Sequence, residues 1–305
     1  FLIISGFIYY NQTYPQTEDS ETQLQPETET EENNIGNEPD NDQQNAQEEE
    51  NQEQSLTDDI KDTVRTVVNN ALSVFTKQDV KIVAIGDSLT QGVGDTTNNG
   101  GYVGILENTF QDANQDVEIV NYGKRGNRSD QLLKRLEQVE IAESIKESDI
   151  ILITIGANDI MKVVKKNFTN LRYQPFAEER VHYTERLKEI FNKLTDLNSD
   201  ADIYLIGLYN PFEKYFGDIE QLDQIMSSWN AAGQLVANEY DQLSFIPIDD
   251  EFRTSEKNLF SDDNFHPNVD GYQLIAGRVL EAIQSSLEEA NIETEETTEE
   301  TNNES

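Results

Sequence analysis

Runs of isoleucine and valine recur along the middle of the chain at intervals of roughly 30 to 50 residues. In the segments between them, apolar side chains recur every three or four residues, which is typical of helices with one buried face. The runs predict strands over 81–85, 117–120, 150–155, 201–206 and 243–248. The periodic segments predict helices over 60–75, 102–110, 130–142, 176–197, 219–240 and 271–287.

This alternation of strands and helices predicts the fold class. Strand then helix, repeated five times, indicates an α/β protein: a three-layer, doubly wound parallel sheet of five strands with helices on both faces. In such sheets, ligands bind at the carboxyl ends of the strands, where the connecting loops gather. A catalytic side chain should therefore directly follow a strand.

The two ends of the chain differ from the middle in composition. Residues 11–57 and 288–305 are rich in Glu, Gln, Asn and Thr and contain no Lys or Arg. Segments with so few large apolar side chains cannot offset the entropy lost on ordering, so we expect a disordered acidic linker and a disordered acidic tail. Residues 58–287 would then form the folded domain, which is long enough to bury one large core.

The first ten residues, FLIISGFIYY, are uncharged and mostly apolar. A helix that spans a membrane needs about 20 such residues, so these ten amount to half a span. We expect the end of a membrane anchor or of a signal segment, which would attach the chain to a membrane through its N-terminus; the alternative is an apolar end without function. The chain has no cysteine, which fits an extracytoplasmic location.

The charge of the chain argues against one class of partner. The 60 acidic and 22 basic side chains give a formal charge of −38, and residues 61–287 alone have a net charge of −14. Proteins that bind nucleic acid need a basic face for the phosphates, and no basic cluster is visible in the sequence. We therefore expect no nucleic-acid partner.

Ser88 is the first candidate for chemistry. It lies in the sequence Gly-Asp-Ser-Leu-Thr, directly after the predicted strand 81–85. The glycine permits a tight turn that lifts the following side chains toward the loop edge, where a nucleophilic hydroxyl must lie. Asp and Ser are also favoured as helix caps, so this motif alone leaves both interpretations open. The G-x-S-x-G motif of α/β-hydrolases is absent, because position 90 is Thr.

A serine nucleophile needs a base, and the chain has two histidines. His182 falls inside a predicted helix, where a structural role is the better interpretation. His266 lies in the polar loop Asp-Asp-Asn-Phe-His-Pro after the last predicted strand. Asp263, three residues earlier, can accept a hydrogen bond from one ring nitrogen while the other faces Ser88, with Asp262 as its competitor. The alternative for this loop is an acidic turn ended by proline.

Two further loops carry candidate hydrogen-bond donors for an oxyanion. Asn158 follows the strand 150–155, where its amide could donate to an oxyanion or simply cap the next helix, as could Asp159. After the strand 117–120, either Gly123 or Gly126 could present a backbone N–H to the cleft or serve as a turn residue.

These four loops together resemble the GDSL or SGNH family of esterases and lipases. The family's blocks occur in order, and the resemblance covers about residues 80–285. The blocks are GDSLTQG at Ser88, a glycine block in NYGKRGNRS, GAND at 156–159 and DNFHP at 263–267.

The resemblance implies a role for each site residue and a flavodoxin-like sheet without metal or organic cofactor. Ser88 would be the nucleophile, with His266 as its base and Asp263 supporting His266. The backbone N–H of Ser88, Gly126 and Asn158 would form the oxyanion hole. Gly126 is preferred to Gly123 because the Asn-Arg-Ser sequence that follows it matches the small polar continuation of the family block.

The residues and the resemblance together predict hydrolysis of a carboxylic ester through an acyl-enzyme intermediate. The substrate would be a small-molecule, lipid or glycan ester. The first alternative is an O-acetyl esterase that acts on cell-wall or other polysaccharides. The second is a surface binding module that keeps the sheet and has lost activity. The pocket is expected to be shaped by residues 162–174 and by the aromatic-rich loop 209–216.

Overall fold

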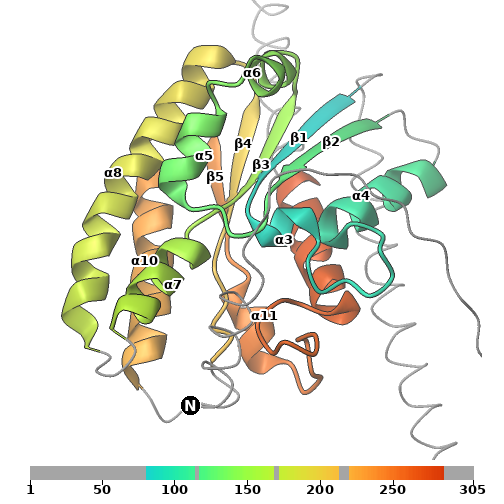
Figure 1. Ribbon diagram of the computed structural model, residues 1–305. Coiled ribbons are helices and arrows are strands. Elements are labelled where there is room, and N and C mark those ends of the chain that lie inside the picture. The colour runs from blue at the N-terminus through green and yellow to red at the C-terminus, as the bar shows by residue number, and fades with distance from the viewer. Residues whose placement is uncertain (1–79, 114–116, 168–171, 213–219, 285–305) are drawn as a thin grey trace, which may run out of the picture. The chain divides into compact units, whose positions relative to one another are not determined.

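The computed structural model describes residues 80–113, 117–167, 172–212 and 220–284. The expected anchor segment, acidic linker, helix over 60–75 and acidic tail lie outside the described residues. Within them, a parallel sheet of five strands in the order β2-β1-β3-β4-β5 confirms the predicted fold class (Figure 1). The strands are β1 (Val80–Gly86), β2 (Val117–Gly123), β3 (Ile150–Thr154), β4 (Asp202–Ile206) and β5 (Leu243–Ile246).

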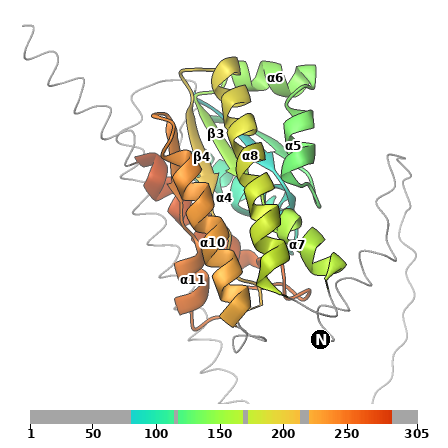
Figure 2. The same cartoon turned by 90° about the vertical axis from the view of Figure 1, so that its left-hand side faces the viewer.

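Helices cover both faces of this sheet. One face packs against α4 (Gly101–Asp112) and the last helix, described over 269–284. The other carries the remaining long helices, among which α8 and α10 lie side by side in front of the sheet (Figure 2). These helices are α5 (Ser129–Arg135), α6 (Val139–Lys146), α7 (Ala157–Lys166), α8 (Tyr173–Leu197) and α10 (Glu220–Ala237).

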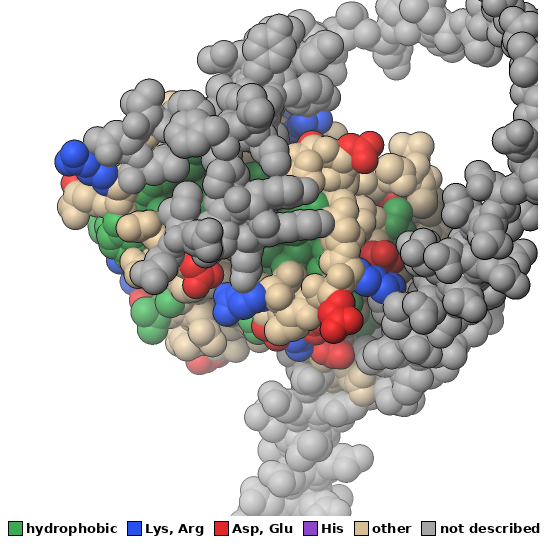
Figure 3. Space-filling view, turned by 90° about the horizontal axis from the view of Figure 1, so that it is seen from below, with side chains coloured by type: hydrophobic (Ala, Val, Ile, Leu, Met, Phe, Trp, Pro, Cys, Tyr) green, Lys and Arg blue, Asp and Glu red, His purple; other side chains and the backbone are tan. Residues whose placement is uncertain are grey.

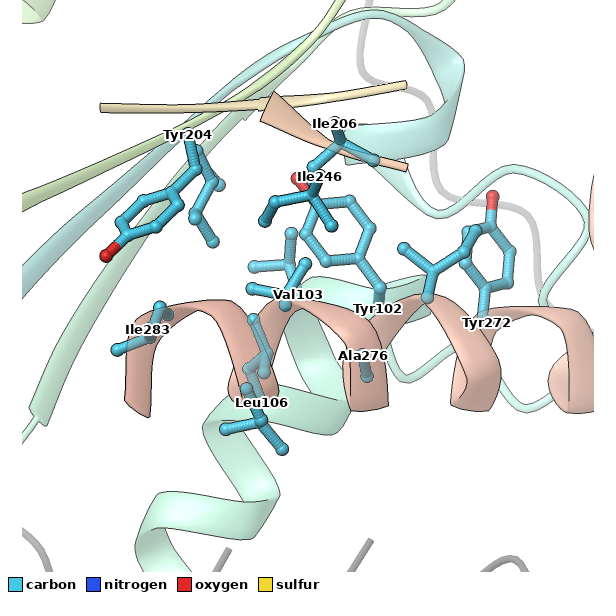
Figure 4. Packing of buried hydrophobic residues seen from close by; sticks show 14 of the residues in the cluster. Tyr102, Val103, Leu106, Tyr204, Ile206, Ile246, Tyr272, Ala276 and Ile283 are labelled. Carbon is cyan, nitrogen blue, oxygen red and sulfur yellow. The ribbon is translucent and has the colours of Figure 1, made fainter. Parts of the chain in front are cut away.

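The apolar runs that predicted the strands form the middle layer. All five residues of β3 are buried, as expected for a strand covered on both faces. On the α4 side, Figure 4 shows aromatic and branched side chains from α4 and the last helix meeting those of β4 and β5. Tyr102, Tyr272 and Ile283 are all fully buried in this cluster. None of the helices in the described part of the chain is long and apolar enough to cross a membrane.

The register of the strands aligns the loops that follow them. Gly86, the last residue of β1, pairs with Gly123 of β2 on one side and with Thr154 of β3 on the other. Three neighbouring strands therefore end at the same level. The short helices α3 (Ser88–Gln91) and α11 (Asp249–Thr254), together with α7, follow β1, β5 and β3 at this edge, below the sheet in Figure 1.

One predicted helix is wrong in its extent. The segment 130–142 forms two helices, α5 and α6, separated by a turn. There, the N–H groups of Glu137 and Gln138 donate to carbonyls three residues earlier, and Leu136 is buried at the corner. The apolar spacing survives this turn, so periodicity did not reveal it. The short helices α3 and α11 were not predicted, because helices of four and six residues carry too little periodic signal.

Candidate active site

Ser88 is the first residue of helix α3, two positions beyond the end of β1. The capping role falls to its neighbour: the Asp87 carboxylate accepts a hydrogen bond from the N–H of Leu89 at 3.0 Å. The Ser88 hydroxyl is thus left for another partner, and Ser88 is 7% exposed at the mouth of a pocket. The helix-cap interpretation of the Gly-Asp-Ser motif therefore applies to Asp87, and Ser88 remains the candidate nucleophile.

His266 is that partner. Its Nε2 lies 3.0 Å from Ser88 Oγ, and its Nδ1 lies 2.5 Å from Asp263 Oδ2. These partners assign the tautomer: Nδ1–H donates to the carboxylate, and Nε2 accepts from the serine hydroxyl. The structure thus brings three of the predicted site residues into contact. The two competing residues lie outside this arrangement. Asp262 is exposed, and His182 is exposed on α8 beside Glu185.

Asp263 is held in place by its own loop. Its Oδ1 accepts hydrogen bonds from the backbone N–H groups of Phe265 and His266, each at 2.9 Å, and from the Ser261 hydroxyl at 3.0 Å. Burial raises the pKa of Asp263, but the hydrogen bond and positive charge of His266 and the two backbone donors outweigh it. The pKa therefore lies well below its ordinary value. The carboxylate is ionised beside the imidazole at neutral pH.

Two contacts fix the histidine loop against the rest of the site. The Tyr209 hydroxyl donates to the carbonyl of Phe265 at 2.9 Å. Gly94, with φ +100°, passes so close that a Cβ there would lie 2.9 Å from His266 Cβ and 2.5 Å from the Pro267 carbonyl oxygen. Only glycine adopts this backbone conformation in this space, so the imidazole is supported from behind by main chain.

The two glycines that competed as oxyanion donors have different surroundings. A Cβ on Gly123 would lie 2.2 Å from Gln91 N and 2.5 Å from Thr90 C, so Gly123 lets β2 pack directly against α3. Gly126 has φ +76°, is exposed, and would direct a Cβ into open space. Gly123 is therefore required for packing, whereas Gly126 is not packed against other residues and remains the candidate donor.

Asn158 lies near the start of α7, and its amide is oriented by the neighbouring loop. Nδ2 donates to the carbonyl of Asn127 at 3.0 Å, which leaves the second N–H of the amide available. The backbone N–H groups of Ser88 and Gly126 also donate to no described residue. These three candidate donors come from three post-strand loops, and each has an N–H without an acceptor among the described residues.

Asp159 does not cap α7, contrary to one sequence interpretation: the helix begins earlier than expected, at Ala157, with Gly156 as its cap. Asp159 is fully buried, and its carboxylate accepts hydrogen bonds from the N–H of Ser129 at 3.0 Å and from its hydroxyl at 2.7 Å. Arg186 of α8 donates to both residues. Sequence reasoning missed this network, which joins α7 to the start of α5.

Asp87 is a second buried carboxyl beside the nucleophile. Its Oδ1 accepts from the Thr154 hydroxyl at 3.0 Å, and a chain of hydroxyls continues through Thr90 to Tyr102. Burial raises the pKa of Asp87 to about 6, against the opposing hydrogen bonds of Leu89 and Thr154. The Gly-Asp-Ser motif places Asp87 beside the nucleophile, but no pattern in the sequence predicts its burial.

A pocket opens beside Ser88 and His266. Apart from those two residues, Asp87 and Thr154, its lining is almost entirely apolar. The walls come from the start of α7, the segment after β4, α10 and the histidine loop; they include Ile160, Met161, Leu208, Phe212, Met226 and Phe265. Figure 3, viewed from below, shows hydrophobic side chains in the central part of this face.

Of the two segments expected to shape the pocket, the one after β4 is confirmed for its described residues 209–212. Tyr209, Pro211 and Phe212 line the pocket, whereas residues 162–167 and 172–174 do not. The helix α7 reaches the pocket with Ile160 and Met161, which directly precede the expected insert. Within the described ranges, no group of three or more His, Asp or Glu side chains is arranged to hold a metal ion.

Comparison with known proteins defines the class. The model of the GDSL-like lipase/acylhydrolase family matches residues 84–274, and the chain belongs to this family. The fold and family together make it a serine ester hydrolase.

The chain is similar to particular members. It is 35% identical to the uncharacterized protein YpmR of Bacillus subtilis, covering 68% of this chain and 83% of YpmR. It is 27% identical to the spore germination lipase LipC of Bacillus licheniformis, and the match covers 68% of this chain and 99% of LipC. Among solved structures, the lipase Lip_vut3 from a goat rumen metagenome aligns with a TM-score of 0.59 at 26% identity. The alignment covers 66% of this chain and 95% of Lip_vut3.

The two loop glycines give a first testable contrast. Gly123→Ala should lower the free energy of unfolding by about 3 kcal/mol or more, because its Cβ would collide with the backbone of α3. Gly126→Ala should cost only about 1 kcal/mol, from the positive φ alone. Urea unfolding of both variants measures the difference. The reverse order would contradict the placement of these glycines.

Asp87 gives a second prediction. Because the folded state raises its pKa from 3.8 to about 6, the folded state binds more protons than the unfolded state between these values, and the unfolding free energy falls as pH rises through this window. Between pH 5 and 7.5, the wild type should lose roughly 1–2 kcal/mol relative to Asp87→Asn. Urea unfolding of both proteins at the two pH values measures this loss. A constant difference between them would show that Asp87 does not titrate there.

Proposed function

We propose that Ser88 is the nucleophile of this ester hydrolase, with His266 as its general base and Asp263 as the residue that orients His266. The observation that carries the proposal is the unbroken hydrogen-bond chain from Ser88 Oγ through both ring nitrogens of His266 to Asp263. As Ser88 Oγ attacks the ester carbonyl, its proton passes to Nε2, and the ionised Asp263 stabilises the imidazolium that forms.

The acyl-enzyme then forms and breaks in two balanced steps. The imidazolium gives its proton to the alkoxy oxygen, and the carbon–oxygen bond of the ester breaks. The alcohol leaves, and the acyl group remains bound to Ser88 Oγ. Water attacks this acyl group while His266 takes its proton, and the return of that proton to Ser88 Oγ releases the acid. The N–H groups of Ser88, Gly126 and Asn158 would stabilise the negative oxygen formed in both steps.

We propose further that the preferred substrates are esters with an apolar acyl chain of several carbons. The pocket beside Ser88 offers such a chain apolar walls and few groups that could bind sugar hydroxyls. Burying each methylene contributes about 0.8 kcal/mol. Four methylenes beyond an acetyl group would therefore improve kcat/KM by about two orders of magnitude.

The pocket also argues against the O-acetyl esterase as the main activity. An acetyl group is too short to contact most of the apolar side chains that line it. Both methionines of the chain, Met161 and Met226, line this cavity. Their flexible, polarisable side chains can adapt to bound chains of different shape, which favours a range of acyl groups over a single small one.

Loss of the nucleophile or the base should abolish turnover. Ser88→Ala should lower kcat by about a million-fold, and His266→Ala by a similar factor, because such residues act as a unit. His182→Ala is the matched control, since His182 is the other histidine of the chain and is exposed. Hydrolysis of p-nitrophenyl butyrate by the purified proteins measures the rates. Wild-type rates in Ser88→Ala or His266→Ala would refute the assignment.

A bulkier side chain in the pocket should shift the substrate preference toward shorter acyl chains. Met226→Trp should lower kcat/KM for p-nitrophenyl octanoate by at least about ten-fold, because the indole occupies space for several methylenes, and should leave the acetate within about two-fold. Leu235→Trp on the exposed face of the same helix, where Leu235 is 67% exposed, is the control. If the wild type prefers acetyl esters and releases acetate from acetylated glycans, the acyl-chain proposal fails and the O-acetyl esterase is favoured.

A further inference from the structure

Arg135, at the end of helix α5, reaches back to the loops that precede its own helix. Its guanidinium donates to Tyr122 O at 2.6 Å, to Asn127 Oδ1 at 2.8 Å and to Gly86 O at 3.3 Å. Gly86 and Tyr122 belong to the ends of the paired strands β1 and β2. One planar group therefore joins the strand that leads to Ser88, the neighbouring strand and the loop that carries Gly126.

Arg135 is paired differently from Arg186, the arginine that donates to Ser129 and Asp159. Arg186 donates to the carboxylates of Asp159 and Glu179. Arg135 is half-buried and forms no ion pair with any described carboxylate, and its acceptors are two carbonyls and an amide oxygen. Burial lowers its pKa, but a guanidinium stays protonated at neutral pH. A desolvated cation without a carboxylate partner costs stability, which suggests a role other than stability.

Asn127 links this cation to the candidate oxyanion donors. The residue is 4% exposed and is held at both ends: its side-chain oxygen accepts from Arg135, and its carbonyl accepts from Asn158 Nδ2. The amide plane of Asn158 depends on that carbonyl, so a shift of Asn127 would rotate the amide. Gly126, directly before Asn127, would shift with it.

We propose that Arg135 is a positioning residue for the oxyanion hole. It fixes Asn127, and through Asn127 it aims the Asn158 amide and the Gly126 N–H at the negative oxygen that forms during ester cleavage. The three acceptors lie on two strands and a loop, so the planar fork of arginine is required, and the single ammonium of lysine cannot reproduce it. This inference rests on the proposed roles of Asn158 and Gly126.

The consequence is a loss of transition-state binding with little loss of substrate binding. Arg135→Met and Arg135→Lys should each lower kcat by about 10- to 100-fold, with KM within about two-fold of the wild type. An alkyl trifluoromethyl ketone, which forms a negative tetrahedral adduct with the serine, should bind each variant more weakly by about the same factor as kcat/KM. Kinetics with p-nitrophenyl butyrate and inhibition by the ketone supply the two measurements.

The adjacent Lys134 provides the control. It is exposed on the same helix, and Lys134→Met removes one positive charge without touching the loop, so its kcat and ketone affinity should match the wild type. If Arg135→Met does not fold, as thermal melting would show, Arg135→Lys decides alone. Wild-type kcat in Arg135→Lys, or a rise in KM that accounts for its whole loss of kcat/KM, would overturn the inference.

Failure of the inference can be told from failure of the proposed function. An active wild type, an inactive Ser88→Ala and a fully active Arg135→Lys would refute only the role of Arg135. A wild type that hydrolyses no ester, or an active Ser88→Ala, would refute the proposed function itself.

Discussion

The site depends on the parallel, level pairing of neighbouring strands. His266 and Ser88 are 178 positions apart in the chain, and their hydrogen bond can form only because both loops lie at the same edge of one sheet. The pairing of Gly86 with Gly123 and Thr154 brings three strand ends to one level. Each short loop beyond them then has only a few residues in which to aim a side chain or an N–H.

The polar groups at this edge are buried or half-buried and hydrogen-bonded to one another, and they join the loops. The Asp159 carboxylate fixes the start of α5 to α7, with Arg186 bridging both. Arg135 joins the loop before α5, through Asn127, to the ends of β1 and β2. Hydrogen-bond donors that are already in place need no rearrangement when negative charge forms in the reaction. They therefore stabilise that charge more effectively than water molecules, which must reorient.

The sequence predicted the five strands, the fold class and the contacts among Ser88, His266 and Asp263. Buried parallel strands appear as apolar runs, and residues that directly follow strands share an edge. The split of 130–142 into α5 and α6 was missed because a turn of three residues preserves apolar spacing. The roles of Arg135 and Asp159 were missed because their partners lie on other elements, and charge alone does not reveal which arginine is buried.

The central claim is that the fold, and not the Gly-Asp-Ser sequence by itself, makes Ser88 reactive. The most direct measurement is labelling of the protein with an alkyl fluorophosphonate, followed by peptide mapping with mass spectrometry. The account predicts a single adduct on Ser88 in the folded protein and no labelling of Ser88 after unfolding in urea, because the contact with His266 is then lost. An adduct on a different residue, or labelling of Ser88 at the same rate in the unfolded chain, would contradict it.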